Sequence, residues 1–335
     1  MVQDIGVKNL QDQTTPRPIL EAGRDYPKIY REFVEWFPDN ESCIAYLEKL
    51  RWPSGFICPA CNFASAPWRQ TRGRLVCPNC RHQASVTRGT IFDKTRTPLT
   101  TWFETAWLMT TAKNGLSAKT LNRTLGTSYR TAWSMLHRYR IAMVRSEREE
   151  LSGFVEIDES LVGGVDHGGK RGRGSDKAIV VIAVEIKELK GYGRVRMRHI
   201  PNASGDALVP FVCDVVSSGS TIQTDGWNGY NDLQQNGYVH QKKIISSSDD
   251  PAHVSMPGVH RIASLLKRWI LGTHQGSVRA EHLQSYLEEF TFRFNRRTSQ
   301  SRGLVFRRLL EQAVVTGPII ENEIAHGFDW SHHNI

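Results

Sequence analysis

FVEID at residues 154–158 has the pattern of a buried strand that ends in an acidic residue. The apolar, β-branched run AIVVIAV at residues 178–184 predicts a second strand, buried on both faces. Residues 194–200 alternate basic and apolar side chains, as a strand with one buried face does. A helical pattern follows at residues 207–216, and TIQTD at residues 221–225 then predicts another strand that ends in an acid. The sequence therefore predicts a mixed sheet with a helix before its fourth strand.

Three strands, a helix, a fourth strand and a further helix, in this order, are typical of a ribonuclease-H-like α/β core. The first and fourth strands are neighbours in such a core, so we expect Asp158 and Asp225 to face each other at one edge of the sheet. Two carboxylates a few ångströms apart offer the hard oxygen ligands that Mg²⁺ or Mn²⁺ requires for phosphoryl transfer. The alternative is that both acids only form turns at strand ends.

A third metal ligand is expected from a helix further along the chain. No Asp or Glu occurs in residues 251–280, so His260, at the start of a helical pattern, is the candidate. Neutral imidazole binds divalent metals and suits Mn²⁺ better than Mg²⁺. Lys267 lies two helical turns further on the same face, where it could hold a phosphate. Asp250 and His253 are the competing candidates for the third ligand.

Four of the six cysteines form two CxxC pairs separated by fifteen residues. The pairs are Cys58 with Cys61 and Cys77 with Cys80. Each CxxC turn directs two thiolates to one point, and zinc takes four such ligands in a tetrahedron. The residues between the pairs alternate like a short hairpin, which predicts a zinc ribbon with structural zinc and no open coordination position. Unpaired thiols or a redox CxxC would not explain two copies, and His82 is the one alternative ligand.

A helix-turn-helix is predicted within residues 98–143. Ser117 is a suitable N-cap, Gly126 ends the first helix, and Thr127 or Ser128 caps the second. Groove contacts would come from the start of the second helix. The candidate DNA-contacting residues of this segment are Lys119, Arg123, Ser128, Tyr129 and Arg130. The alternative is a helical hairpin that serves only as a linker.

The positive charge of the chain is concentrated in one segment. The chain has 43 Lys and Arg against 34 Asp and Glu, a net charge of +9, whereas residues 51–150 alone have 16 against 5, a net +11. A localised excess of this kind is typical of a segment that binds a polyanion, although a solvated basic face without a partner is the alternative. Further candidate phosphate contacts are Lys170, Arg171 and Arg173 in a Gly-rich turn, Arg194, Arg196 and Arg198 in the basic strand, and Arg268.

The composition is that of a globular protein with several domains. Its 335 residues are 39% hydrophobic and 23% charged, without an apolar run long enough to span a membrane and without an apolar N-terminal segment, so a cytoplasmic protein is expected. The two remaining cysteines, Cys43 and Cys213, are expected in the core. We predict a multidomain α+β chain with a mobile segment 1–27, a helical entry and zinc ribbon 28–97, a helix-turn-helix 98–150, a ribonuclease-H-like core 151–315 and a C-terminal tail 316–335.

Together these motifs resemble the bacterial insertion-sequence transposases that join an N-terminal zinc ribbon to a DDE-type core. The resemblance covers roughly residues 30–315. The matching pieces are the four cysteines, VEIDE at 155–159 with Gly163 and Gly164, GGKRGRGSD at 168–176, TDG at 224–226, SLLKR at 264–268 with GTH at 272–274, and FTFRFNRR at 290–297. The family usually has Glu, and sometimes Asn, where His260 stands. Because the surrounding helix and Lys267 are retained, we favour a working Asp-Asp-His triad over an inactive one.

The resemblance implies a DNA transposase that binds the end repeats of its element, cleaves DNA by metal-dependent hydrolysis and joins the 3′ ends to target DNA. It implies Asp158, Asp225, His260 and Lys267 in catalysis, structural Zn²⁺, catalytic Mg²⁺ or Mn²⁺, double-stranded DNA as partner, a homodimer or larger assembly on DNA, and a nucleoid-associated location. A second hypothesis is a catalytically inactive DNA-binding regulator derived from a transposase. A third is a zinc-ribbon adaptor between proteins.

Overall fold

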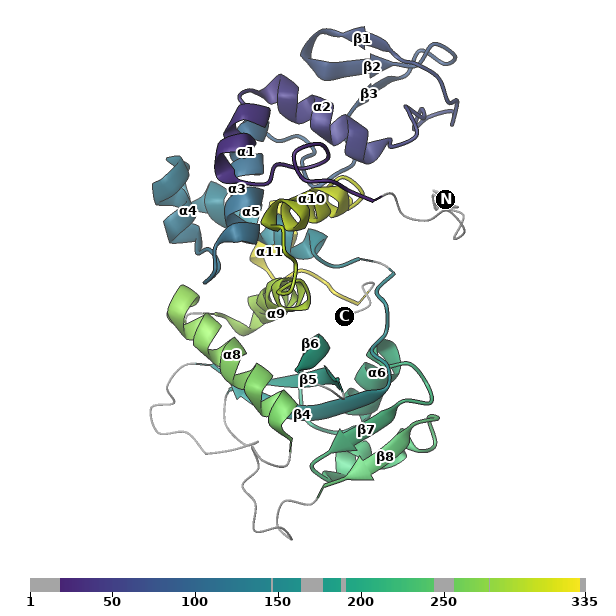
Figure 1. Cartoon of the computed structure of the whole chain (residues 1–335), viewed down its shortest axis with the longest axis vertical. Helices are drawn as coiled ribbons and strands as arrows, with labels where there is room; N and C mark the ends of the chain where they lie inside the picture. The colour runs from purple at the N-terminus through teal and green to yellow at the C-terminus, as the bar shows by residue number, and fades with distance from the viewer. Residues whose placement is uncertain are drawn as a thin grey trace.

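The computed structural model describes residues 19–145, 147–163, 177–187, 191–243, 256–276 and 278–331. Figure 1 shows a small three-stranded sheet at one end of the long axis, a larger sheet at the other end, and a bundle of helices between them. The larger sheet and the helices around it position the acidic residues, and the bundle holds the predicted helix-turn-helix.

The larger sheet has five strands in the order β6-β5-β4-β7-β8. Its strands are β4 (Phe154–Val162), β5 (Ala178–Ile186), β6 (Tyr192–Ile200), β7 (Thr221–Thr224) and β8 (Val239–Lys242). The first three strands are antiparallel neighbours, and β7 lies parallel to both β4 and β8. The first and fourth strands are therefore adjacent, as the ribonuclease-H-like prediction requires, and the predicted mixed sheet is confirmed.

Helices cover both faces of this sheet (Figure 1). On one face, α6 (Gly205–Val215) and the short 3-10 helix η3 (Asn228–Leu233) form an apolar cluster with Val155, Ile157 and Ile222. On the other face, α8 (Pro257–His274) and α9 (Ala280–Asn295) pack against Ile182 and Val184. Odd and even positions of β4 and β5 thus point to opposite faces, as strand geometry dictates.

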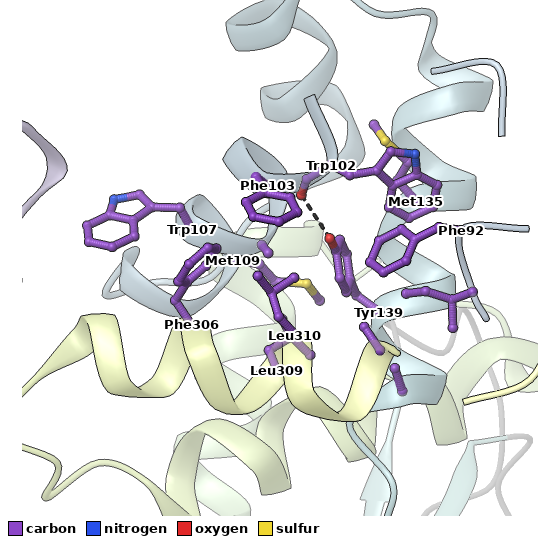
Figure 2. Packing of buried hydrophobic residues seen from close by; sticks show 14 of the residues in the cluster. Phe92, Trp102, Phe103, Trp107, Met109, Met135, Tyr139, Phe306, Leu309 and Leu310 are labelled. Carbon is purple, nitrogen blue, oxygen red and sulfur yellow. Dashed lines mark hydrogen bonds between the residues drawn. The ribbon is translucent and has the colours of Figure 1, made fainter. Parts of the chain in front are cut away.

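The helical bundle is built around aromatic side chains. Its helices are α1 (Tyr30–Trp36), α2 (Asn40–Arg51), α3 (Leu99–Thr111), α4 (Ala118–Leu125), α5 (Tyr129–Ala142), α10 (Arg302–Ala313) and α11 (Glu321–Ala325). Figure 2 shows Phe306 and Leu309 of α10 packed beside Phe103 and Trp107 of α3. The Tyr139 hydroxyl, fully buried, donates a 2.8 Å hydrogen bond to the carbonyl of Trp102, which joins α5 to α3.

The three-stranded sheet contains β1 (Trp68–Gln70), a single 3-10 turn at Thr71–Gly73, β2 (Arg74–Val76) and β3 (Gln83–Ser85), all antiparallel. The hairpin predicted between the two CxxC pairs is therefore present. Its core is small, and the apolar cluster within it consists of Phe56, Leu75 and Ala84 with two of the cysteines.

The packing divides the chain differently from the predicted boundaries. Although residue 315 was expected to close the core, α10 packs in the helical bundle with α3, far from the sheet edge that holds the acids. The segment expected to be a tail also packs there, with Ile319 and Ile324 buried. Cys43 is buried as expected, but Cys213 is exposed on α6, so its predicted core position is wrong. No helix among the described residues is long and apolar enough to cross a membrane.

Candidate active site, metal centre and nucleic-acid interface

The four cysteines of the CxxC pairs converge at one point. The Sγ atoms of Cys58 and Cys80 are 3.6 Å apart, those of Cys61 and Cys77 are 3.7 Å apart, and all four lie within 4.8 Å of one another. Sulfur ligands about 2.3 Å from one tetrahedral zinc ion are about 3.8 Å apart, so the cluster fits zinc without rearrangement. Among the described residues, His82 is not part of the cluster.

The backbone around the cysteines is arranged alike in both CxxC turns. Asn62 and Arg81, which each follow the second cysteine of a pair, adopt positive φ angles of 57° and 61°. This turn directs the N–H of Phe63 to Cys61 Sγ, and that bond lowers the pKa of the Cys61 thiol to about 6. The thiolate, which is the form that binds zinc, is therefore available at neutral pH.

Asp158 and Asp225 come together because β4 and β7 are parallel neighbours. Val155 pairs with Ile222 and Glu156 with Gln223 in this ladder. The same register carried two residues further sets Asp158 level with Asp225, on strands that run about 4.8 Å apart. The sequence placed Asp158 at a strand end, but β4 continues to Val162. It is β7 that ends, at Thr224, so Asp158 lies beside the open end of its neighbour.

Local backbone bonds hold both carboxylates. Asp158 Oδ1 accepts a 2.8 Å bond from the N–H of Glu159, and Asp225 Oδ1 accepts a 2.9 Å bond from the N–H of Trp227. The turn after Asp225 needs glycine, because Gly226 has a φ of 86°. The Trp227 indole anchors this turn by donating to the carbonyl of Ala203 at 2.7 Å. One oxygen of each aspartate is thus positioned by the main chain.

Tyr230 contacts the acidic edge from the face of the sheet that α6 covers, opposite to α8. Its hydroxyl, fully buried, donates a 2.5 Å hydrogen bond to Glu159 Oε1. Burial raises the pKa of the Tyr230 phenol well above its usual value, and the negative charges of Glu159, Asp158 and Asp225 raise it further. The phenol therefore stays protonated and acts as a fixed donor beneath both aspartates. Sequence reasoning missed this residue, since no local pattern connects it with β4.

Glu156 connects β4 to the helix that carries His260. Its buried carboxylate accepts a 3.0 Å bond from the N–H of Val259, and it also receives the N–H of Gly258. Burial raises the pKa of this carboxyl, while the two N–H bonds partly offset that rise. A β-carbon at Gly258 would lie 2.7 Å from Glu156 Oε2, so only glycine allows this approach. Glu156 and Asp158 share one face of β4, so this contact places the first turn of α8 over the acidic edge.

His260 follows directly in that first turn, and Lys267 lies further along α8. Partial burial of the Lys267 stem lowers the pKa of its amine, and the positive charge of Lys177 lowers it as well. Within the described ranges, the cysteine cluster is the one group of three or more His, Cys, Asp or Glu close enough to hold a metal, so His260 does not close around the two aspartates. Asp250 and His253 lie outside the described residues.

The two helices predicted for the helix-turn-helix are present, with the predicted caps. Ser117 caps α4 by accepting from the N–H of Thr120 at 3.1 Å, Gly126 ends α4 in the left-handed conformation, and Ser128 caps α5. The Ser128 hydroxyl accepts from the N–H of Thr131 at 3.0 Å, so its first role is structural. The other candidates of this segment, Lys119, Arg123, Tyr129 and Arg130, are exposed.

The basic strand does not provide the predicted phosphate contacts. Arg196 is buried and donates to the carbonyl of Glu149, while Arg194 is held by the carboxylates of Glu185 and Glu149. Arg198 pairs with Asp214 at 2.8 Å. The sequence pattern could not show these bonds, because the acidic partners of Arg194 and Arg198 lie 9 to 45 residues away and not within the strand. Arg268 is exposed on α8, and Lys170, Arg171 and Arg173 lie outside the described residues.

Comparisons with known proteins find matches for two parts of the chain, the five-stranded sheet with its helices and the cysteine-bearing segment. Residues 150–295 match a family model described as the ISXO2-like transposase domain, and residues 38–83 match one described as the transposase zinc-ribbon domain. The chain is also 25% identical over 306 residues to a Halobacterium salinarum protein named "Uncharacterized protein in transposable element ISH50". That alignment covers 84% of this chain and 97% of the relative. The first match spans the five-stranded sheet with α8 and α9, and the second spans most of the cysteine-bearing segment.

Proposed function

We propose that this chain is an insertion-sequence transposase that cleaves DNA at the ends of its element and joins the freed 3′ ends to target DNA. The matches to a transposase domain over residues 150–295 and to a transposase zinc-ribbon domain over residues 38–83 support this proposal. The observation that carries the proposal is the parallel pairing of β4 with β7, whose register, continued by two residues, sets Asp158 level with Asp225. Carboxylates in this arrangement are the ligands that phosphoryl-transfer enzymes use for divalent metals.

Asp158 and Asp225 would hold Mg²⁺ or Mn²⁺, and His260 would join them from α8. When bound, such a metal lowers the pKa of a water ligand and stabilises the charge on the leaving oxygen. The backbone N–H bonds to Asp158 and Asp225 would hold the two carboxylates in place for the metal. An imidazole in place of the usual carboxylate favours Mn²⁺ over Mg²⁺. Lys267, whose amine projects from the exposed side of α8, would bind a DNA phosphate near this edge.

The zinc ribbon and the helix-turn-helix would bind the end repeats. Both lie in the segment with a net charge of +11, and the exposed Lys119, Arg123, Tyr129 and Arg130 surround the start of α5. Because phosphate contacts release counterions, we expect the affinity for DNA to fall steeply with salt. We further expect at least a dimer on DNA, because two ends must be brought together, and this is measurable by light scattering of the DNA complex.

The test uses the purified full chain and duplexes that carry the termini of its own element. We expect nicking at the end and transfer to a second duplex in Mn²⁺, with lower rates in Mg²⁺. Asp158→Asn and Asp225→Asn should each reduce nicking at least about 100-fold without changing DNA affinity, because removing one metal ligand costs this much or more. Asp232→Asn, at an exposed acid of η3 outside the site, is the matched control. Nicking by Asp158→Asn at the wild-type rate would contradict the proposal, and binding without nicking by the wild type would favour a regulator.

A further inference from the structure

The C-terminal segment packs on the start of the proposed recognition helix α5. Ile319 and Ile324 are buried in the helical bundle, and the N–H of Ile320 donates to Glu323 Oε2 at 3.0 Å, which caps α11. Glu321 is the first residue of α11, and it lies between the buried Ile319 and Ile324, which anchor this segment. Its carboxylate reaches Arg130 in the first turn of α5.

The contact engages only one edge of the Arg130 guanidinium. Nε donates to Glu321 Oε1, and the terminal Nη1 and Nη2 groups bond to no other side chain or carbonyl in the part of the chain that the structure describes. The Arg130 side chain is 81% exposed, and the bond to Glu321 raises its pKa, so the guanidinium stays charged and faces solvent. The bond at Nε favours one orientation of the guanidinium and leaves its two terminal nitrogens facing solvent.

The surroundings of this pair suit a DNA groove. A cleft of about 600 Å³ lies between residues 93–97, the start of α5 and residues 318–321. Lys94, Arg96 and Arg138 line it together with Arg130, and Asp93 and Glu321 are its acidic members. The positive end of the α5 dipole opens toward the same place. If the phosphates of a DNA strand bind in this cleft, the first turn of α5 lies at the base edges of the major groove.

We propose that Glu321 orients Arg130 so that its two terminal nitrogens read the O6 and N7 atoms of one guanine in the major groove. The inference rests on the proposed binding of end repeats and adds a specificity-determining residue from the far end of the chain. Arginine is suited to guanine because its planar fork matches these two acceptors. Glu321 is a positioning residue here, because it acts on DNA only through Arg130.

The experiment measures the affinity of the full chain for end duplexes in which each guanine in turn is replaced by 7-deazaguanine, which lacks the N7 acceptor. We expect the wild type to lose about 5- to 100-fold in affinity at one guanine position. Arg130→Ala should bind the unmodified duplex correspondingly more weakly and show no further loss at that position. Glu321→Gln should retain overall binding but show a loss at that guanine at least about threefold smaller than that of the wild type.

Glu323→Gln is the matched control, since it removes the same charge from the same helix while its amide oxygen can still accept from Ile320. It should match the wild type at every position. If Glu321→Gln shows the same loss at each guanine as the wild type, the inference is overturned. It is also overturned if Glu321→Gln binds scrambled duplexes more tightly than the wild type does, because Glu321 would then compete with DNA for Arg130. Equal affinity of the wild type for end and scrambled duplexes overturns both the inference and the proposed recognition of end repeats.

Discussion

At the residue scale, Glu156 shows how one buried carboxylate sets the position of a helix. It is 3% exposed and accepts two backbone N–H groups from the first turn of α8, where no side chain of the helix itself forms a cap. The helix therefore begins where β4 allows it to begin. Asp158 lies two residues after Glu156 on β4, and His260 lies two residues after Gly258 on α8. The contact between Glu156 and Gly258 therefore also sets the position of His260 relative to Asp158.

Replacing Glu156 with Ala should detach the start of α8 from the sheet. Two buried N–H groups would lose their acceptor, which costs about 0.5–2 kcal/mol of unfolding free energy, and we expect nicking to fall by at least about tenfold because His260 moves. Glu156→Gln keeps one acceptor oxygen and should stay within about 1 kcal/mol of the wild type. Urea unfolding and the nicking assay measure both quantities. Equal nicking by the Ala and Gln variants would show that this contact does not position the site.

Residue-scale prediction from sequence was good for local contacts and poor for distant ones. Ser117, Gly126 and Ser128 could be assigned as caps because their partners lie within four residues. Glu156 was read only as part of a strand, because its partners are about 100 residues away. The bonds of Arg194 and Arg196 were also not visible in the sequence, because their partners lie 9 to 47 residues away, outside the strand.

At the element scale, the cysteine-bearing segment is too small to fold on apolar contacts alone. Its core contains Phe56, Leu75 and Ala84, with Cys58 and Cys77 as the remaining buried members. Two of the five residues of this cluster thus belong to the four cysteines that are arranged to hold zinc. A sheet of three short strands with so little buried apolar surface requires a metal for stability.

Removing zinc should therefore unfold this segment while leaving the five-stranded sheet intact. We expect a strong chelator to raise amide hydrogen exchange across residues 56–85 and to lower affinity for end duplexes, with exchange in β4 and β5 unchanged. Cys77→Ser should behave like the chelated wild type. Cys213→Ser, at the exposed cysteine of α6, is the control and should keep both zinc and protection. Unchanged exchange in this segment after complete loss of zinc would contradict the prediction.

Element types and their order were predictable because each element carries its own periodicity. The strands, the hairpin and the paired helices of residues 117–142 follow from spacing alone. The extension of β4 beyond Asp158 was not predictable, because it depends on full pairing with β5 up to Val162. The place of α10 was missed as well, since an amphipathic helix shows which face is apolar but not which partner covers it.

At the scale of the whole molecule, α9 joins the helical bundle to the sheet. Along one side its Gln284 and Asn295 accept from the N–H groups of His199 and Val195 in the edge strand β6. On the other side Glu289 pairs with Arg140 of α5 at 2.8 Å, with both side chains at most 1% exposed. The helix thus satisfies an open strand edge and connects α5 to the sheet.

Breaking the Arg140–Glu289 pair should destabilise the joint between the two parts. Arg140→Met leaves the Glu289 carboxylate buried with only Arg293 nearby, at 3.8 Å, and we expect a loss of about 3–5 kcal/mol in unfolding free energy. The double variant Arg140→Met/Glu289→Leu should recover most of that loss, because no charge then remains buried.

Urea unfolding of the single and double variants measures the coupling. The exposed pair Arg31–Glu35 offers a matched control, and its disruption should cost at most about 0.5 kcal/mol. If Arg140→Met lowers the free energy of unfolding no more than the control variant does, the Arg140–Glu289 pair does not hold α9 between the bundle and the sheet.

One bundle contains α1 to α5 and also α10, although the whole five-stranded sheet lies between them in sequence. During synthesis the ribosome delivers α1 to α5 first and the sheet next, whereas Phe306 and Leu309, which cover the aromatic face of α3, follow only after the sheet. Until then that face stays open to water, even though every strand of the sheet already exists. A product that stops before α10 would contain the acidic residues but no closed bundle. We therefore expect that truncated chains cannot bind the ends of the element, and that they do not compete there with the complete protein.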